Sequence, residues 1–340
     1  MTKETIEEKI LGLPSRQVVP YAVPMLIREF DFFNRFGKEA LSLEGICGKF
    51  NFDSRVGDAM VSYLAKEGFL EYKSGRYTVS KTATDMLTTE ANQDLTNYAL
   101  LIDQVIPRKI PDSIRDALLT GKPQRFVDSS WEDSMKSGAI SKSFSDGMMA
   151  RAEWLKLSLA DKMKLFICQG EDEKLLDLGG SLGDYCGAFT TAFNHLAATV
   201  YELPSVAEHT RKNIKEKGYK NVEVVSGDFF KDELPTGFNT HFYSNVMHDW
   251  KPREVVQLLR KSYKSLPIRG KVLVHDMHLN DNKTSPDYVV DHSLYLSIFT
   301  NGRCYSNLEM ENFMERAGFD NVEYAPTLCG FGVVSGEKRK

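Results

Sequence analysis

The chain has 340 residues and an ordinary apolar content, which is enough for two domains or for one large domain with an appendage. Its formal net charge of −4 gives no general attraction to nucleic acid or to an anionic membrane. No apolar run approaches the roughly 20 residues that a membrane span needs, and the polar, acidic N-terminus does not resemble a signal peptide. The five cysteines are widely spaced without a C-x-x-C pair, which is typical of reduced thiols in a cytoplasmic protein.

The first hundred residues predict several helices followed by a small hairpin. Three stretches carry apolar residues at helical spacing: 18–36, 41–50 and 56–68. In the hairpin, a turn that contains Gly75 joins short strands at 69–72 and 76–79. Helices followed by a hairpin are typical of a winged helix. We therefore expect a winged-helix-like domain over residues 1–100, with a helical bridge over residues 101–165.

From residue 166 to residue 340 the pattern changes to short apolar strands that alternate with helices. Seven strands are expected, at 175–178, 199–202, 222–225, 241–246, 271–274, 322–325 and 332–335. Helical patterns lie between the first of them, such as 184–195 and 204–218, and the capping-box pair Ser306 and Glu309 opens a later helix. This alternation is typical of an α/β fold with a doubly wound, mostly parallel sheet.

A glycine turn follows the first of these strands. Gly179, Gly180 and Gly183 let the backbone turn tightly and approach a ligand without clashes from a Cβ atom. A ligand at such a turn lies in the crevice at the carboxyl edge of the sheet. The spacing G-G-x-x-G differs from the G-x-G-x-x-G of a dinucleotide dehydrogenase, although the logic of the turn is shared. By itself the turn is weak evidence for any one ligand.

Acidic residues follow the next two strands. Glu202 ends the second strand, where a carboxylate can accept both ribose hydroxyls of a nucleoside. After the third strand, Asp228 can accept an adenine amino proton and Phe229 can pack on the base. A solvated strand end explains Glu202 equally well, and a helix N-cap explains Asp228. Three such features at three successive strand ends nevertheless favour a nucleoside-binding edge.

Two further residues at the same edge can carry proton transfer. The fourth strand runs into His248, and the fifth runs through His275 to Asp276. A neutral His248 could remove a proton from a phenol or enol as its oxygen attacks a methyl sulfonium, while Asp276 holds the other ring nitrogen. No metal is expected for this chemistry. His275 and His278 are three apart in a strand and so face opposite sides, which disfavours a shared metal.

The remaining histidines have no pattern that indicates a role. We interpret them as partly buried or surface residues: His195, His209, His241 and His292.

Five motifs in fixed order resemble a known enzyme family: DLGGSLG (177–183), YELP (201–204), GDFF (227–230), MHDW (247–250) and GKVLVHD (270–276). They are similar to those of the plant caffeate-type and bacterial natural-product O-methyltransferases, including enzymes of hydroxyindole type. The resemblance implies a class I, Rossmann-like methyltransferase domain over residues 166–340. It also implies that residues 1–100 form a dimerisation domain and that the bridge at residues 101–165 contributes to the acceptor pocket.

The same resemblance implies roles for individual residues. Carried over by position, S-adenosylmethionine would be bound by Asp177, Gly179, Gly180, Glu202, Asp228, Phe229 and Ser244. His248 would be the catalytic base, oriented by Asp276, and S-adenosylhomocysteine would be the product. Candidates for binding a small, hydroxylated, aromatic acceptor are Phe144, Met148, Arg151, Met247, Tyr295, Phe299 and Cys304. We expect no metal and no nucleic-acid or membrane partner.

The segment from Gly302 to Ser306 departs from the family pattern. Plant members usually carry a second base-positioning glutamate where this chain has Cys304. One carboxylate is then sufficient, or the acceptor is unusual. The fold also hosts members that keep the cofactor and perform other chemistry, so methyltransferase-fold chemistry without methyl transfer stays an alternative.

A DNA-binding regulator with a winged helix is the second alternative. Its recognition helix would lie at residues 54–67, where two basic and two acidic side chains cancel. A helix without net positive charge is poorly suited to neutralising phosphates. Salt-sensitive binding of duplex DNA by residues 1–100 in a gel shift would favour this alternative.

We predict a homodimer formed through the N-terminal domain. The motivation is a cluster of aromatic residues that would need a partner surface unless it forms the core of its own domain: Phe30, Phe32, Phe33 and Phe36. Sedimentation at micromolar concentration should show a dimer, and a monomer there would refute the prediction.

Overall fold

A computed structural model describes residues 22–52, 57, 60–61, 63–65, 67–89, 95–96, 120–123, 149, 152–153, 155–167, 173–283, 285–328 and 330–339. The chain divides into two compact units: Met1–Ile106 with Ser129–Trp154, and Pro107–Asp128 with Leu155–Lys340. The predicted domain boundaries at residues 100 and 165 stay a prediction. In the described part of the chain, no helix is both long and apolar enough to cross a membrane.

The described residues of the first unit form short helices and a hairpin. Its elements are α2 (Ala22–Phe30), α3 (Phe32–Phe36), α4 (Leu43–Phe50), β1 (Leu70–Lys73), β2 (Arg76–Val79) and α6 (Lys81–Leu87). The single helix predicted over 18–36 is broken at Asp31, whose φ of 47° is left-handed and cannot continue an α-helix. The hairpin is confirmed: β1 and β2 pair antiparallel across Ser74 and Gly75, which both have positive φ. Of the helix predicted over 56–68, the described residues 57, 60–61 and 63–65 are helical, and a turn follows at 67–68. The winged helix as a whole stays a prediction.

Aromatic rings form the core of this first unit. Phe32, Phe33 and Phe36 are buried, and Phe30 packs edge-on against Phe52 with ring centroids 4.9 Å apart. These rings therefore fill the core of their own unit and do not present a partner surface. The homodimer stays a prediction, but this aromatic cluster no longer supports it.

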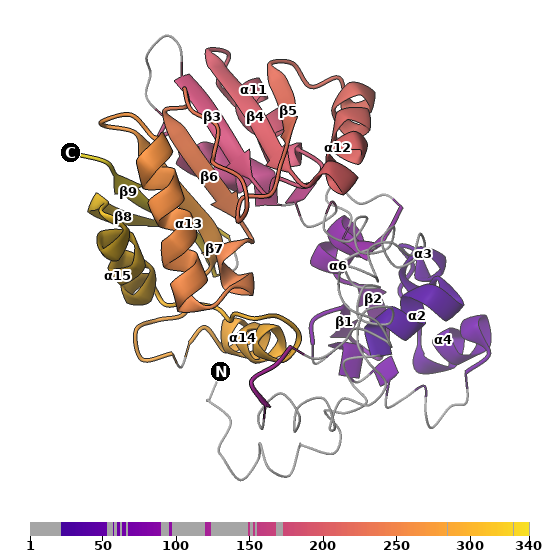
Figure 1. The fold of residues 1–340 in the computed structure, drawn as a ribbon. Helices are drawn as coiled ribbons and strands as arrows, with labels where there is room; N and C mark the ends of the chain where they lie inside the picture. The colour runs from indigo at the N-terminus through magenta and orange to yellow at the C-terminus, as the bar shows by residue number, and fades with distance from the viewer. Residues whose placement is uncertain are drawn as a thin grey trace. The chain divides into compact units, whose positions relative to one another are not determined.

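The second unit is built on a seven-stranded sheet, in the order β5-β4-β3-β6-β7-β9-β8 (Figure 1). Its strands are β3 (Glu173–Leu178), β4 (Leu196–Glu202), β5 (Val222–Ser226), β6 (Thr240–Ser244), β7 (Lys271–Met277), β8 (Asp320–Pro326) and β9 (Phe331–Glu337). The first five pair in parallel, and β9 pairs antiparallel with both β7 and β8. The predicted mostly parallel α/β sheet is confirmed.

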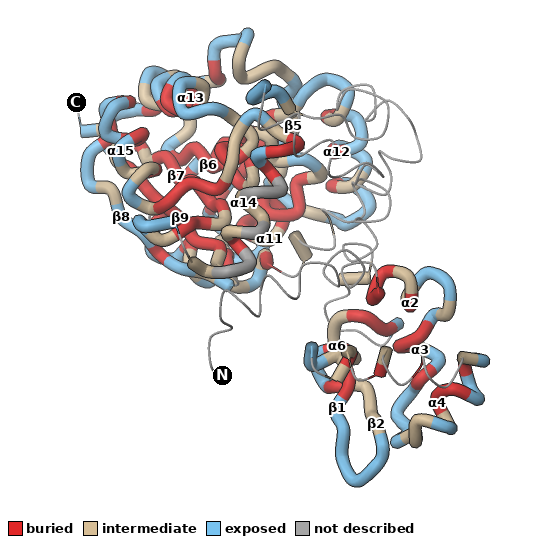
Figure 2. The backbone as a smooth tube through the Cα atoms, turned by 90° about the horizontal axis from the view of Figure 1, so that it is seen from below, coloured by how far each residue is buried: buried red, intermediate tan, exposed pale blue. Residues whose placement is uncertain are grey.

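Helices cover this sheet and protect its apolar strands. They are α11 (Asp184–Ala192), α12 (Pro204–Lys217), α13 (Pro252–Ser265), α14 (Asp287–Phe299) and α15 (Asn307–Ala317). Helices α11 and α12 pack against β4 and β5, while α13 and α15 pack on each other (Figure 1). The capping box predicted for α15 is confirmed, since Ser306 Oγ accepts from Glu309 N at 3.2 Å. Buried residues are concentrated in the strands, as Figure 2 shows.

The parallel order places the ends of the first five strands at one edge of the sheet. In a doubly wound sheet this carboxyl edge, where the strand order reverses, is the usual place for a ligand. Here the reversal lies between β3 and β6, which are neighbours although β4 and β5 separate them in sequence. The residues after β3 and β6 are therefore expected to border a common site.

Phe242 should be one of the residues on which the sheet depends most. It is fully buried on β6 and packs edge-on against Phe189 with ring centroids 5.3 Å apart. We expect Phe242→Ala to lower the free energy of unfolding by about 3–5 kcal/mol in urea denaturation. Val225→Ala, on the edge strand and 38% exposed, is the matched control and should cost less than about 1 kcal/mol. Equal losses of unfolding free energy in the two variants would contradict a special role of Phe242 in the core.

Candidate active site

The turn after β3 needs its glycines. Gly179 and Gly183 have φ of 78° and 81°, in the left-handed region that side chains disfavour. A Cβ on Gly179 would also lie 2.9 Å from Cγ2 of Val246, and one on Gly180 would clash with the carboxyl group of Asp177. The backbone between β3 and α11 can therefore pass close to its neighbours, and no side chain at these glycines separates it from a ligand.

Glu202 joins this turn to the end of β4. Its Oε1 accepts from Ser181 N at 3.1 Å, and its Oε2 accepts from Leu203 N at 2.8 Å. Burial raises the pKa of Glu202 above its ordinary value, although these two backbone donors oppose the shift. Each carboxylate oxygen keeps a further lone pair, so the group can still accept hydroxyl hydrogens from a ligand.

Asp228 caps the turn that follows β5. Its Oδ1 accepts from Phe230 N at 2.9 Å, and its Oδ2 lies 2.9 Å from Nζ of Lys231. The hydrogen bond from Lys231 foremost holds the pKa of Asp228 below its ordinary value, against a smaller effect of burial. The sequence allowed a helix N-cap at Asp228, but no helix follows it, and the carboxylate caps a turn instead. A role towards adenine would come in addition to this.

Phe229 brings the loop after β5 to the glycine turn. Its Cε1 lies 3.6 Å from the place that a Cβ on Gly179 would occupy. The rings of Phe229 and Phe230 are edge-on, with centroids 5.0 Å apart. The ends of β3, β4 and β5 therefore come together as the sequence predicts.

Asp177 lies beneath the turn instead of at its surface. Its carboxyl group is completely buried and accepts from Sγ of Cys186, which lies 3.4 Å from Oδ2. Burial raises the pKa of Asp177 to about 7, and the hydrogen bond from Cys186 counteracts this only in part. From this position Asp177 supports the turn from below.

Ser244, at the end of β6, is engaged with the neighbouring strand. Its Oγ lies 2.9 Å from Nδ1 of His275 on β7, and Nδ2 of Asn245 donates to the same oxygen at 3.0 Å. Ser244 and His275 are both buried. A cofactor at this edge would therefore contact a hydroxyl group that already has two polar partners, His275 and Asn245.

His248 and Asp276 form a buried pair at the ends of β6 and β7. His248 lies in the short 3-10 helix η3 (Met247–Asp249), and its Nδ1 is 2.9 Å from Oδ1 of Asp276. Burial by itself would raise the pKa of Asp276, but the nearby imidazoles, that of His248 foremost, hold the pKa below its ordinary value. The other ring nitrogen of His248, Nε2, lies 3.8 Å from Oδ1 of Asp249.

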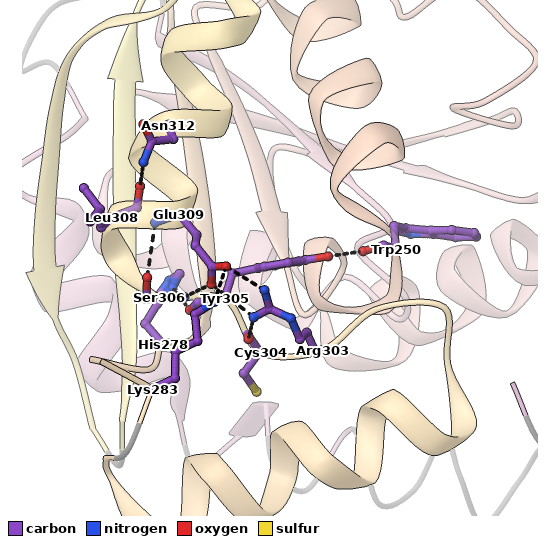
Figure 3. Close-up of polar contacts among 10 residues, drawn as sticks. All are labelled: Trp250, His278, Lys283, Arg303, Cys304, Tyr305, Ser306, Leu308, Glu309 and Asn312. Carbon is purple, nitrogen blue, oxygen red and sulfur yellow. Dashed lines mark hydrogen bonds and ion pairs between the residues drawn. The ribbon is translucent and has the colours of Figure 1, made fainter. Parts of the chain in front are cut away.

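The segment that contains Cys304 packs directly on this 3-10 helix. A Cβ on Gly302 would clash with the backbone of His248 and lie 2.6 Å from Trp250 N. Figure 3 shows that Oη of Tyr305 reaches the carbonyl of Trp250, to which it donates at 2.5 Å. The Gly302–Tyr305 segment therefore lies beside His248, where the sequence places the missing glutamate.

Cys304 itself is fully buried in an apolar setting. It clusters with Leu279, and with Val289 and Leu296 of α14, towards which its sulfur points in Figure 3. Burial raises the pKa of its thiol to about 12, so the group is neutral at physiological pH. Cys304 thus cannot supply the negative charge of the expected glutamate.

The other acceptor candidates are placed to different degrees. Met247 is fully buried in the main core of the second unit, and Phe299 is buried at the end of α14. The backbone of Tyr295 lies in α14, but its side chain is outside the described residues. Phe144, Met148 and Arg151 also lie outside them.

His292 is a residue near the site that the sequence analysis missed. Its ring lies edge-on to that of His248, with centroids 6.1 Å apart and planes at 76°. The signal was present, because His292 is a polar residue in the middle of the largely apolar helix α14. Without the fold, nothing indicated that α14 lies next to the 3-10 helix.

Among the described residues, no three or more histidine, cysteine, aspartate or glutamate side chains are grouped so that they could hold a metal ion.

Asp177 should make stability depend on pH. Its folded pKa of about 7 exceeds the ordinary 3.8, so between these values the folded chain binds more protons than the unfolded chain. Its contribution to stability is then complete below about pH 4 and is lost as the pH rises through about 7. An asparagine side chain cannot ionise. The melting temperature of Asp177→Asn should therefore increase relative to that of the wild type as the pH rises from about 5 to about 8.

The exposed Asp281→Asn is the control for this prediction and should show no such gain. A constant difference between the Asp177→Asn protein and the wild type across the same pH range would contradict the prediction.

Comparisons with known proteins agree with this fold. Residues 112–320, more than half of the chain, match the model of the O-methyltransferase domain. The chain is 26% identical to L-tyrosine C(3)-methyltransferase of Streptomyces lavendulae over 293 residues, which are 83% of this chain and 78% of that protein. It is 25% identical to 3-hydroxy-5-methyl-1-naphthoate 3-O-methyltransferase of Streptomyces sahachiroi, over 84% of this chain and 82% of that protein.

The fold is that of human N-acetylserotonin methyltransferase, which was solved in complex with S-adenosylmethionine. The two chains match over their whole lengths with a TM-score of 0.79 and 17% identity. With the matched domain and these relatives, the chain belongs to the O-methyltransferase family and is an S-adenosylmethionine-dependent O-methyltransferase.

Proposed function

We propose that this enzyme methylates a hydroxyl group of a small aromatic metabolite, with His248 as the general base and Asp276 as the residue that orients it. The observation that carries the proposal is the 2.9 Å contact between Nδ1 of His248 and Oδ1 of Asp276. The pair is buried at the edge of the sheet where the glycine turn and Glu202 also lie.

The residues at this edge suit S-adenosylmethionine. The left-handed glycines leave room for a close approach, and Glu202 keeps lone pairs for ribose hydroxyls while its backbone donors hold it in place. The ring of Phe229 beside Gly179 offers an apolar wall for a base. Asp177 supports the turn from below, and Ser244 borders the edge from β6. In the proposal these residues hold the cofactor.

The cofactor supplies a methyl group on a positively charged sulfur that leaves as a neutral thioether. The chain must then align an acceptor and take its proton. In the proposal the hydrogen of the neutral imidazole sits on Nδ1, facing Asp276, so that Nε2 accepts the hydroxyl proton as the oxygen–methyl bond forms.

Asp276 favours the charge that this step creates. Its pKa is held below the ordinary value, so the carboxylate is ionised at neutral pH. A buried negative charge 2.9 Å from the ring stabilises the imidazolium that His248 becomes. With a neutral thiol at position 304, Asp276 is the carboxylate that fixes the ring.

An aromatic acceptor is supported by the relatives, one of which is named for a hydroxynaphthoate and another for tyrosine. The acceptor pocket would be completed by residues from several segments, and one of its side chains can change selectivity. The family resemblance also implies roles in acceptor binding for Phe144, Met148 and Arg151, which lie outside the described residues.

Methylation of carbon is a second candidate, because one relative is named as a tyrosine C(3)-methyltransferase. Removal of a phenol proton by His248 makes the carbon beside the oxygen nucleophilic as well. The electron pair then forms a carbon–methyl bond, and a later proton loss from that carbon restores the ring. The same base serves both outcomes, and the pose of the acceptor decides between them.

Calorimetry followed by a panel of phenols tests the proposal. S-adenosylmethionine and S-adenosylhomocysteine should bind the wild-type chain, and at least one phenol should gain a methyl group by mass. The position of that methyl group by NMR separates oxygen from carbon. A chain that binds neither nucleoside would contradict the cofactor site, and a chain that binds both but methylates no phenol would contradict the acceptor class.

His248→Ala should keep its affinity for S-adenosylhomocysteine and lose about 10²- to 10⁴-fold in turnover, because general-base catalysis is worth that much. Asp276→Asn should fall between this variant and the wild type, since the base is present but misoriented. The exposed His209→Ala is the control and should behave as the wild type. Unchanged turnover would remove His248 from the mechanism, whereas lost affinity would give it a binding role.

A further inference from the structure

The loop that carries Asp228 and Phe229 lacks regular secondary structure. It spans residues 227–239, between β5 and β6, and contains no helix or strand. Its first residue is tied to β4, since Gly227 N donates to the carbonyl of Glu202 at 2.9 Å. Within the loop, Asp228 Oδ1 accepts from Phe230 N, and contacts with other parts of the unit add to this internal hydrogen bond.

Lys261 of α13 supplies such contacts. Its ammonium group donates to three carbonyl oxygens of the loop: those of Phe229 at 2.7 Å, Phe230 at 3.2 Å and Asp232 at 2.5 Å. A lysine ammonium has three N–H donors, so this arrangement uses its full capacity. The loop thereby receives from one side chain the hydrogen bonds that a strand partner would otherwise provide.

These bonds are strong for their kind. Hydrogen bonds from an ionised donor are about twice as strong as neutral ones, and the half-buried position of Lys261 limits competition from water. Turning the carbonyl groups of residues 229 and 230 towards α13 fixes the peptide planes on both sides of Phe230, the first of which follows Phe229. The plane before Phe229 is held within the loop, because Asp228 O accepts from Lys231 N at 3.0 Å and from Asp232 N at 2.8 Å. Both planes that flank Phe229 and its ring are thus fixed. The direction in which that ring leaves the backbone is then determined.

An aromatic contact holds the loop from a second side. The ring of Trp250 lies edge-on to Phe230 with centroids 4.5 Å apart, and 6.4 Å from Phe229. Trp250 follows the 3-10 helix of His248 and precedes α13, so the loop is attached to the segment that also carries the base and Lys261.

We propose that Lys261 is a positioning residue for the cofactor, which sets the shape of the loop that faces the adenine without touching the ligand. This rests on the proposed cofactor roles of Asp228 and Phe229. Lys261 acts before the chemical step, so its loss should weaken nucleoside binding and leave the transfer itself unaffected once the cofactor is bound.

The test compares Lys261→Met with Lys264→Met by calorimetry with S-adenosylhomocysteine. Lys264 lies on the same helix and is paired only at the surface, 3.0 Å from Glu233, so its variant removes the same charge without touching the three carbonyls. We expect about tenfold weaker binding for Lys261→Met, the equivalent of roughly one charge-assisted hydrogen bond, and less than about twofold for Lys264→Met.

A graded variant separates positioning from folding. Lys261→Gln keeps two N–H donors, so its affinity should lie between those of the wild type and Lys261→Met, with the melting temperature close to that of the wild type. If Lys261→Met does not fold, the affinity of Lys261→Gln for S-adenosylhomocysteine tests the proposal by itself. Turnover of the Lys261 variants at saturating S-adenosylmethionine should stay within about twofold of the wild type, because Lys261 takes no part in proton transfer. Loss of the base itself would lower turnover by at least about 10²-fold.

Three results would overturn the proposal: a folded Lys261→Gln or Lys261→Met with wild-type affinity, an equal loss in Lys264→Met, or a fall in saturated turnover with unchanged affinity. A wild-type chain that fails to bind S-adenosylhomocysteine would refute the cofactor site itself, and so is distinguishable from a failure of Lys261.

Discussion

Parallel pairing of five neighbouring strands is the constraint on which the site depends. Because β5, β4, β3, β6 and β7 run the same way, the loops that follow them emerge at one edge. The backbone continues this ladder past the strand ends: Gly179 N donates to Tyr201 O, and Asn245 N donates to His275 O. Each loop therefore starts in a position that its neighbour determines. Residues that are far apart in the sequence therefore lie close together because the sheet itself positions them.

Two buried aspartates on this sheet illustrate how surroundings decide charge. Asp177 and Asp276 are both almost completely removed from water, yet the pKa of Asp177 rises to about 7 while that of Asp276 falls. Asp177 has a thiol of Cys186 as its neighbour, and a thiol cannot compensate for lost hydration. Asp276 is surrounded by imidazoles, among which His248 lies at 2.9 Å. The buried Asp177 thus supports a turn, whereas the buried Asp276 carries a negative charge beside the proposed base.

The segment around Cys304 keeps its place without the expected carboxylate. Arg303 forms two hydrogen bonds to Glu309, at 2.6 and 3.1 Å, and its guanidinium lies over the ring of Tyr305 (Figure 3). Tyr305 in turn donates to the backbone of Trp250. The backbone of this segment therefore stays packed beside His248, while the side chain of Cys304 points into an apolar cluster. In the proposed mechanism the base is then oriented by Asp276, with a neutral thiol at position 304 in place of a second carboxylate.

The sequence by itself determined the features that depend on local pattern. Strand and helix periodicity, the glycine turn, the capping box at Ser306 and the order of the motifs were sufficient for the α/β sheet, the family and the cofactor. These signals are contained within a few residues or in spacing along the chain. The meeting of Glu202 with the glycine turn also followed, because parallel strands must end at one edge.

Only the tertiary structure decided what each side chain faces. The break of the first helix at Asp31 was not evident from the apolar spacing. The burial of Asp177 beneath its turn and the engagement of Ser244 with His275 depend on neighbours elsewhere in the chain. The same is true of Lys261, which lies 32 residues from Phe229 in the loop it holds. Periodicity reports that a residue is buried or exposed, but the identity of its partner is set by which elements pack together.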